Sequence, residues 1–156
     1  MAERGFTYIE LIVTLAIMAV LVMVAVPSMR YMIQKQKEYE LRLALAQIRQ
    51  GIDSYKHAAD VGRIQKDVDA TGYPPRLNDL VSGVPDQTAP DHHKLYFLRS
   101  LPADPFFADS TVDPASTWGL RSYASPPDAP VAGSDVFDVY SLSTQTGLNG
   151  IPYKRW

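Results

Sequence analysis

An apolar run of 21 residues at positions 6–26 constrains this chain more than any other feature of its sequence. Thr7, Tyr8, Glu10 and Thr14 are its only interruptions, and Glu10 is its only charged residue. A helix that rises about 1.5 Å per residue spans roughly 30 Å over such a run, which matches the hydrocarbon thickness of a bilayer. The sequence therefore predicts a membrane-spanning helix with one carboxylate near its start.

A cleaved secretory signal fits this run poorly. Such a signal has an apolar core of roughly 7–15 residues followed by a small-x-small cleavage site, whereas this run is longer and ends in Val26-Pro27-Ser28. Removal after the run is not expected, and an ordinary N-terminal anchor stays open as an alternative. The flanking charges do not place the N-terminus in the cytoplasm, because the basic residues lie mostly after the run, between positions 30 and 37.

The overall composition excludes several functions. The fifteen Lys and Arg residues are dispersed among seventeen acids, so the sequence lacks the basic stripe of a nucleic-acid-binding surface. The absence of cysteine removes disulfides, thiolate nucleophiles and Cys-ligated zinc.

The helix is predicted to continue beyond the apolar run as an amphipathic helix. Pro27 predicts a kink or a locally melted turn. Residues 34–40 (QKQKEYE) are polar all round, and an apolar stripe then follows at spacings of 4, 3, 4 and 3: Leu41, Leu45, Ile48, Ile52 and Tyr55. Asp60 and Gly62 predict a stop, with the helix ending at about residue 58. Fewer than three heptads are present, which favours packing against the chain's own later segments over a free coiled coil.

The second half of the chain is predicted to be rich in turns, because eleven of the twelve prolines follow residue 73. Leu77, Leu80 and Val81 indicate a short helical or irregular segment. Residues 118–124 and 136–142 are predicted strands, with a loop at 125–134 (SPPDAPVAGS). Asn149-Gly150 predicts a type I′ turn.

The N-terminal motif has a specific resemblance. MAERG is a short charged leader ending in Gly5, and Phe6-Thr7-Tyr8-Ile9-Glu10 follows it, with Pro27 downstream. This arrangement resembles the type IV pilin-like family, in which a membrane prepilin peptidase cuts after the glycine on the cytoplasmic side and N-methylates the new terminal residue. The resemblance implies processing between Gly5 and Phe6, and an orientation with the C-terminal part in the periplasm.

A second motif points within that family. Tyr73-Pro74 and the later run of residues 101–106 (LPADPF) resemble the Tyr-Pro and Leu-Pro-Ala-Asp-Pro-Trp pattern of the major pseudopilin of type II secretion systems. The resemblance implies a subunit of a periplasmic pseudopilus at the bacterial inner membrane. Its implied partners are copies of itself, the prepilin peptidase, the inner-membrane assembly platform and minor pseudopilins, with no nucleic acid.

Glu10 then has a physical role. Cleavage would expose a cationic α-amino group at Phe6, four residues before the carboxylate. A helix dipole favours an anion in the first turn by about 0.3–1 kcal/mol, and breaking a buried ion pair costs on the order of 3–5 kcal/mol. We expect Phe6, Glu10 and Pro27 to serve assembly, with Glu10 pairing to the Phe6 amine of a neighbouring subunit. The alternative is that Glu10 reaches the lipid headgroups and has no partner.

One departure concerns metal binding. The major pseudopilins carry an acidic, calcium-binding loop near the C-terminus, but residues 144–156 (TQTGLNGIPYKRW) contain no acid. No metal site is therefore assigned, although Asp128, Asp135 and Asp138 precede this region. The Asn149-Gly150 turn is expected to fix the loop instead. Adhesive pilins close this region with a disulfide, so the lack of cysteine favours the secretion-type relative.

No catalytic site is predicted. Asp91-His92-His93 holds the histidine pair, with His57 elsewhere, and no HExxH motif or carboxylate-rich partner accompanies it. A solvated loop explains this pair better than a metal site. The sequence also lacks a Gly-rich phosphate loop and a nucleophile elbow.

These observations predict an α+β fold in which a long N-terminal helix packs on a small antiparallel sheet. The expected organisation is a leader at 1–5, a transmembrane and assembly helix at 6–27, an amphipathic helix at 28–62, and a globular region at 63–156 packed on 41–58. The expected function is a non-enzymatic pseudopilus subunit that helps to drive protein export. A type IV pilus subunit and a monomeric, membrane-tethered periplasmic binding module are the alternatives.

Overall fold

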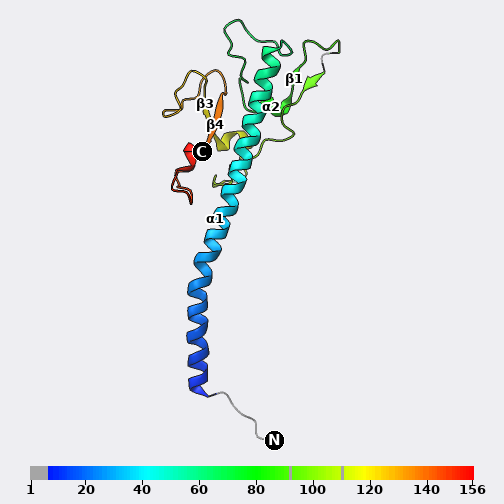
Figure 1. The fold of residues 1–156 in the computed structure, drawn as a ribbon. Helices are drawn as coiled ribbons and strands as arrows, with labels where there is room; N and C mark the ends of the chain where they lie inside the picture. Colours follow the sequence, from blue (N-terminus) through cyan, green and yellow to red (C-terminus); the bar gives the residue numbers. More distant parts are fainter. Residues whose placement is uncertain (1–6, 92, 110) are drawn as a thin grey trace. The chain divides into compact units, whose positions relative to one another are not determined.

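A long helix and two small antiparallel sheets make up the chain (Figure 1). The computed structural model describes residues 7–91, 93–109 and 111–156, with residues 24–27 described by their backbone only. The chain divides into two compact units, Met1–Gln36 and Lys37–Trp156. Helix α1, Tyr8–Asp60, contributes to both.

The described part of the first unit is almost entirely the N-terminal part of α1. The backbone stays α-helical on both sides of Pro27, so the predicted local melting at this residue is wrong. Proline removes one backbone hydrogen bond from a helix, and the bonds of the neighbouring residues can hold the helical path.

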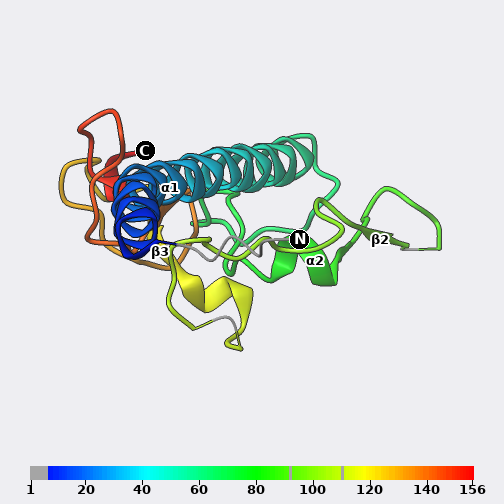
Figure 2. The same cartoon turned by 90° about the horizontal axis from the view of Figure 1, so that it is seen from below.

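The second unit combines the rest of α1 with short elements (Figures 1 and 2). Its two strand pairs are β1 (Val84–Pro85) with β2 (Lys94–Leu95), and β3 (Trp118–Arg121) with β4 (Asp138–Ser141), both antiparallel. The helical pieces are α2 (Asp79–Ser82) and the 3₁₀ turns η1 (Pro114–Thr117) and η2 (Tyr153–Arg155). The α+β class is thus confirmed, and two separate two-stranded sheets stand where one small sheet was predicted.

The core of this unit forms along the predicted apolar stripe of α1. Leu41, Leu45, Ile48, Ile52 and Tyr55 are each at most 6% exposed, which confirms the stripe. The residues that cover it come from the later elements, and the buried ones include Leu77, Leu80, Leu98, Trp118, Val136, Val139 and Tyr153. At Gly51 of α1 a Cβ atom would lie 3.0 Å from Leu98 Cγ, so glycine permits this close approach.

Strand β4 lies within the predicted strand at 136–142, and its residues alternate in burial. Val139 and Ser141 are fully buried, whereas Asp138 and Tyr140 are half-buried. Tyr140 lies opposite Gly119 of β3, and a Cβ atom at Gly119 would stand 2.3 Å from the tyrosine ring. The missing side chain at Gly119 therefore makes room for Tyr140 on this face of the sheet.

Helix α1 ends at the predicted stop. Gly62 adopts a φ of 78°, and the Arg63 N–H donates to the Ala58 carbonyl over 2.9 Å. This backbone pattern is the Schellman cap, which satisfies carbonyls that a helix end leaves unpaired. The helix extends to Asp60, two residues beyond the expected end.

The turn at Asn149-Gly150 forms, but it is not of type I′. The Gly150 N–H donates to the Gly147 carbonyl, and the Gly147 N–H donates to the Ile151 carbonyl, both over 2.9 Å. This is the pattern of a three-residue hairpin loop with glycine in the left-handed position, where Gly150 has a φ of 78°. A bridge between Thr146 and Pro152 closes the loop.

Candidate assembly site

Glu10 lies in the first turn of α1, as its sequence position predicted. The Glu10 N–H donates to the Thr7 carbonyl over 3.1 Å and to Thr7 Oγ1 over 3.3 Å, so Thr7 caps the start of the helix. Glu10 itself is exposed. Its carboxylate therefore lies near the end of the helix where the helix dipole is positive.

The surface around Glu10 is apolar and uncovered. From Tyr8 to Met23 the large apolar side chains are between 47% and 79% exposed. By length and composition, this part of α1 is able to cross a membrane. An uncovered apolar surface of this extent in water is unfavourable, so it is compatible with a membrane anchor or with packing against other helices.

The predicted processing residues, Gly5 and Phe6, lie outside the described residues, and Phe6 also belongs to the predicted assembly site. Their proximity to Glu10 therefore stays a prediction. Pro27 lies within α1, and its backbone is helical.

The sequence interpretation missed one buried acid on α1. The sequence predicts residues 34–40 to be polar all round, yet Glu38 is 4% exposed. Glu38 Oε1 accepts hydrogen bonds from the Leu148 N–H over 2.7 Å and from the Tyr153 hydroxyl over 3.0 Å. The sequence position of Glu38 could have predicted its burial. Glu38 precedes Leu41 by three positions, so it lies on the same face of the helix as the apolar stripe.

The C-terminal segment is also attached to α1 through Arg49. The guanidinium of Arg49 donates to Asp138 Oδ1 and to the Trp156 main-chain oxygen, each over 2.8 Å. Phe106, in the run that resembles the major pseudopilin pattern, stacks on Tyr153 with ring centroids 4.1 Å apart. Helix, central loop and C-terminal segment thus form one packed region of the second unit.

The central loop carries a buried carboxylate as well. Asp104 is 3% exposed and accepts hydrogen bonds from the Ser141 hydroxyl and from the Phe106 N–H, the latter over 2.8 Å. The Trp118 indole N–H donates to the Pro102 carbonyl over 2.8 Å. The bonds from Ser141 and from Trp118 join this loop to strands β4 and β3. The loop is therefore part of the core.

The acids near the C-terminal loop do not form an oxygen cage for a cation. Asp138 pairs with Arg49 and Arg121. Asp135 accepts hydrogen bonds from Thr71, Ser122 and the Tyr123 N–H. Burial acts to raise the pKa of Asp135, but these hydrogen bonds outweigh it and hold the pKa below its usual value.

Within the described ranges, no cluster of three or more His, Asp or Glu side chains is placed to hold a metal ion. Asp128, the remaining acid considered, lies exposed in the loop after β3. The arrangement therefore does not fit the calcium site that the family resemblance implies, since calcium needs six to eight oxygen ligands.

The two histidines that the structure describes lie on the surface. His93 is exposed, and its Nδ1 lies 3.0 Å from Asp91 Oδ1. His57 is exposed in the last turn of α1, and His92 lies outside the described residues.

Comparisons of the chain with known protein families, with curated proteins and with solved structures found no match.

Proposed function

We propose that this chain is a membrane-anchored filament subunit that is cut between Gly5 and Phe6 and polymerises through its N-terminal helix. Its processing follows the type IV pilin-like resemblance of its first residues. The resemblance of Tyr73-Pro74 and of residues 101–106 to the major pseudopilin pattern supports a periplasmic pseudopilus of a type II secretion system as the filament. It would assemble from the inner membrane with the C-terminal unit in the periplasm.

The observation that carries this proposal is the combination found in the first turns of α1. An exposed apolar helix surface surrounds Glu10, the single charged residue of the run. A plain anchor gains nothing from a carboxylate there, because a charged group is costly in hydrocarbon. In a filament, by contrast, the carboxylate of Glu10 can form a specific contact that fixes the axial offset between neighbouring helices.

The partner of Glu10 in this proposal is the α-amino group that cleavage creates at Phe6. Two like helices side by side, offset along their axes, bring the terminus of one level with the first turn of the next. The desolvated pair then opposes any offset that separates the charges, because breaking such a pair costs on the order of 3–5 kcal/mol. A loss of that size would lower the equilibrium constant for adding each subunit more than a hundredfold.

Processing is the first test. Mass spectrometry of the membrane fraction should show loss of the five leader residues and one methyl group on Phe6. A bulky substitution, Gly5→Leu, should leave the leader in place. If the wild-type chain in the membrane keeps its five leader residues, the result would contradict processing and favour the monomeric, tethered binding module.

Polymerisation is the second test. After overexpression, wild-type protein should form fibres in negative-stain microscopy. Glu10→Gln, which keeps the shape of the side chain and removes its charge, should be processed normally but lower fibre yield by more than tenfold. Asp53→Asn is the matched control, because Asp53 is an exposed acid on the same helix outside the apolar run. Equal fibre yield from Glu10→Gln and wild type would contradict the pairing.

A further inference from the structure

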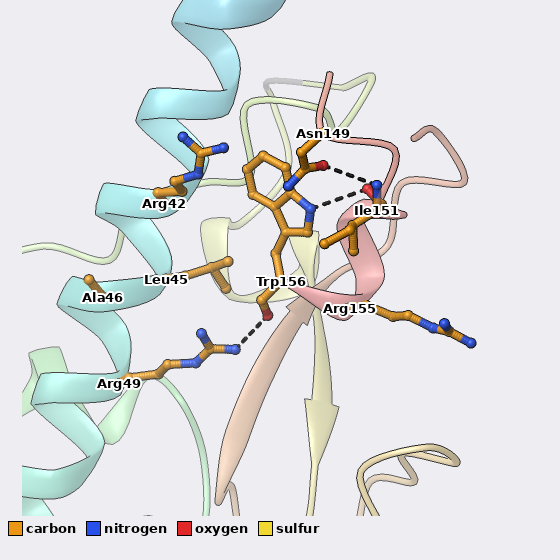
Figure 3. A pocket seen from close by; sticks show the side chains of 8 residues that line it. All are labelled: Arg42, Leu45, Ala46, Arg49, Asn149, Ile151, Arg155 and Trp156. Atoms are coloured by element: carbon orange, nitrogen blue, oxygen red, sulfur yellow. Dashed lines mark hydrogen bonds between the residues drawn. The ribbon is translucent and has the colours of Figure 1, made fainter. Parts of the chain in front are cut away.

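A pocket of about 480 Å³ lies between α1 and the C-terminal segment, inside the second unit (Figure 3). Its apolar lining comes from Leu45 and Ala46 of α1 and from Ile151 and Trp156 of the C-terminal segment. Ile151 is 45% exposed. The pocket therefore offers an open apolar floor, of a size that can take a small side chain with its flanking backbone.

Three arginines also line this pocket, Arg42 and Arg49 from α1 and Arg155 from the C-terminal segment. Arg49 is already engaged by Asp138 and by the Trp156 main-chain oxygen. Arg42 lies over the Trp156 ring at 4.4 Å from the ring centroid. Its guanidinium also lies 3.7 Å from Glu38 Oε2, but its side chain is 57% exposed and can still meet an incoming group. Arg155 extends from the segment into solvent in Figure 3, and among the described residues its guanidinium has no hydrogen-bond or ion-pair partner. Arg42 and Arg155 thus offer positive charge to an incoming group.

A turn elsewhere in the same unit has the complementary character. The Ala70 N–H donates to the Asp67 carbonyl over 3.0 Å, which places Val68 and Asp69 at the tip of a turn. Val68 is 102% exposed, the highest value among the large apolar side chains of the described residues. Asp67 and Asp69 on either side are also exposed. An apolar side chain flanked by two acids is complementary to an apolar floor beside arginines in polarity and in the sign of its charges.

The turn and the pocket occupy different parts of the unit. The turn is tied to the last turn of α1 at both ends. The Arg63 N–H donates to the Ala58 carbonyl, and a Cβ atom at Gly72 would lie 3.6 Å from Ala59 Cβ. The pocket lies against residues 42–49 of α1, roughly 15–25 Å away along the helix axis at 1.5 Å per residue. A contact between two such patches on different copies is heterologous and builds an open chain instead of a closed dimer.

We propose that the turn of one copy docks into the pocket of the next, with Val68 on the apolar floor and Asp67 and Asp69 beside Arg42 and Arg155. This inference rests on the proposed function and adds a second contact to it, made by the C-terminal units. The apolar part supplies burial, and the charges orient the two copies, since opposite charges across an interface fix its register.

Cysteine pairs test this contact directly, because the natural chain has none. Full-length chains carrying Val68→Cys and Ile151→Cys, with different tags, are co-expressed and oxidised in membranes. A disulfide-linked heterodimer is expected, since a bridge requires Cα atoms within about 7 Å. In the control, Val131→Cys replaces Val68→Cys, because Val131 is also an exposed apolar residue but lies in the loop before β4. Equal crosslinking in the control, or a link between two Val68→Cys chains instead, would overturn the proposal.

Charge reversal provides the second measurement. Arg155→Glu should lower the heterodimer yield roughly fivefold, and Asp67→Arg with Asp69→Arg on the other chain should restore it. Fibres that form normally without the heterodimer would overturn this contact and leave the proposed function intact. Unprocessed chains that give neither fibres nor heterodimer would overturn both.

Discussion

Glu38 offers the sharpest test of how the C-terminal segment is held. Its buried carboxylate accepts two hydrogen bonds at Oε1, from Leu148 at 2.7 Å and from Tyr153 at 3.0 Å. A hydrogen bond to a charged group contributes about 1.5–3 kcal/mol. Removing both bonds in Glu38→Ala should therefore lower the free energy of unfolding by about 3–6 kcal/mol, a large share of the roughly 5–15 kcal/mol that stabilises a domain.

The variant Glu38→Gln distinguishes the contribution of the negative charge from that of the hydrogen bonds themselves. Glu38→Gln keeps an oxygen that can accept both bonds, and neutral hydrogen bonds are about half as strong as charge-assisted ones. Its cost should therefore be about 1.5–3 kcal/mol. The nearby ion pair with Arg42 adds little, because Arg42 is more than half exposed and its nitrogen lies 3.7 Å from Glu38.

Urea unfolding of the full chain in detergent micelles measures these differences. The fluorescence of Trp118 and Trp156 reports on the second unit, and Trp156 lies 5.1 Å from Tyr153 between ring centroids. Glu40→Ala is the matched control, because Glu40 is an exposed acid two positions further along the helix. If Glu38→Ala costs less than 1 kcal/mol, or no more than Glu40→Ala, the attachment of the segment through Glu38 is refuted.

Two further predictions concern the end of α1 and the segment after it. Arg63 and Thr88 hold the pKa of Asp86 well below its usual range by hydrogen bonding to it, so the stabilisation is present above the ordinary carboxyl pKa near 4 and is lost as the pH falls below that value. Urea midpoints measured between pH 6 and pH 3 should fall less steeply in Asp86→Asn than in wild type, and parallel curves would contradict this. Gly62 has a φ of 78° and open space where a Cβ would stand, so Gly62→Ala should cost about 1–2 kcal/mol of unfolding free energy from backbone strain alone. Gly62→Asn should cost less, since asparagine tolerates this conformation, and equal costs would contradict the strain argument.

The sequence by itself determined the features that depend on local periodicity. The apolar run, the stripe from Leu41 to Tyr55 and the stop at Gly62 all follow from residues within a few turns of one another. The same holds for Glu10, whose place in the first turn follows from its distance to the start of the run. Helical spacing and the conformational freedom of glycine fix these features wherever the helix packs.

Only the tertiary structure decided which polar groups become internal. Burying the carboxylate of Glu38 is unfavourable unless donors meet it, and those donors, Leu148 and Tyr153, lie 110 and 115 residues away. The pairing of Arg49 with Asp138 could not be predicted from local sequence either, because the two residues are 89 positions apart. The strands β1 and β2 have two residues each, which is too short to show an alternating pattern. They are recognised as strands only because they pair with each other. Local pattern predicts where a helix lies, whereas partners that meet only after folding decide what a charged side chain does.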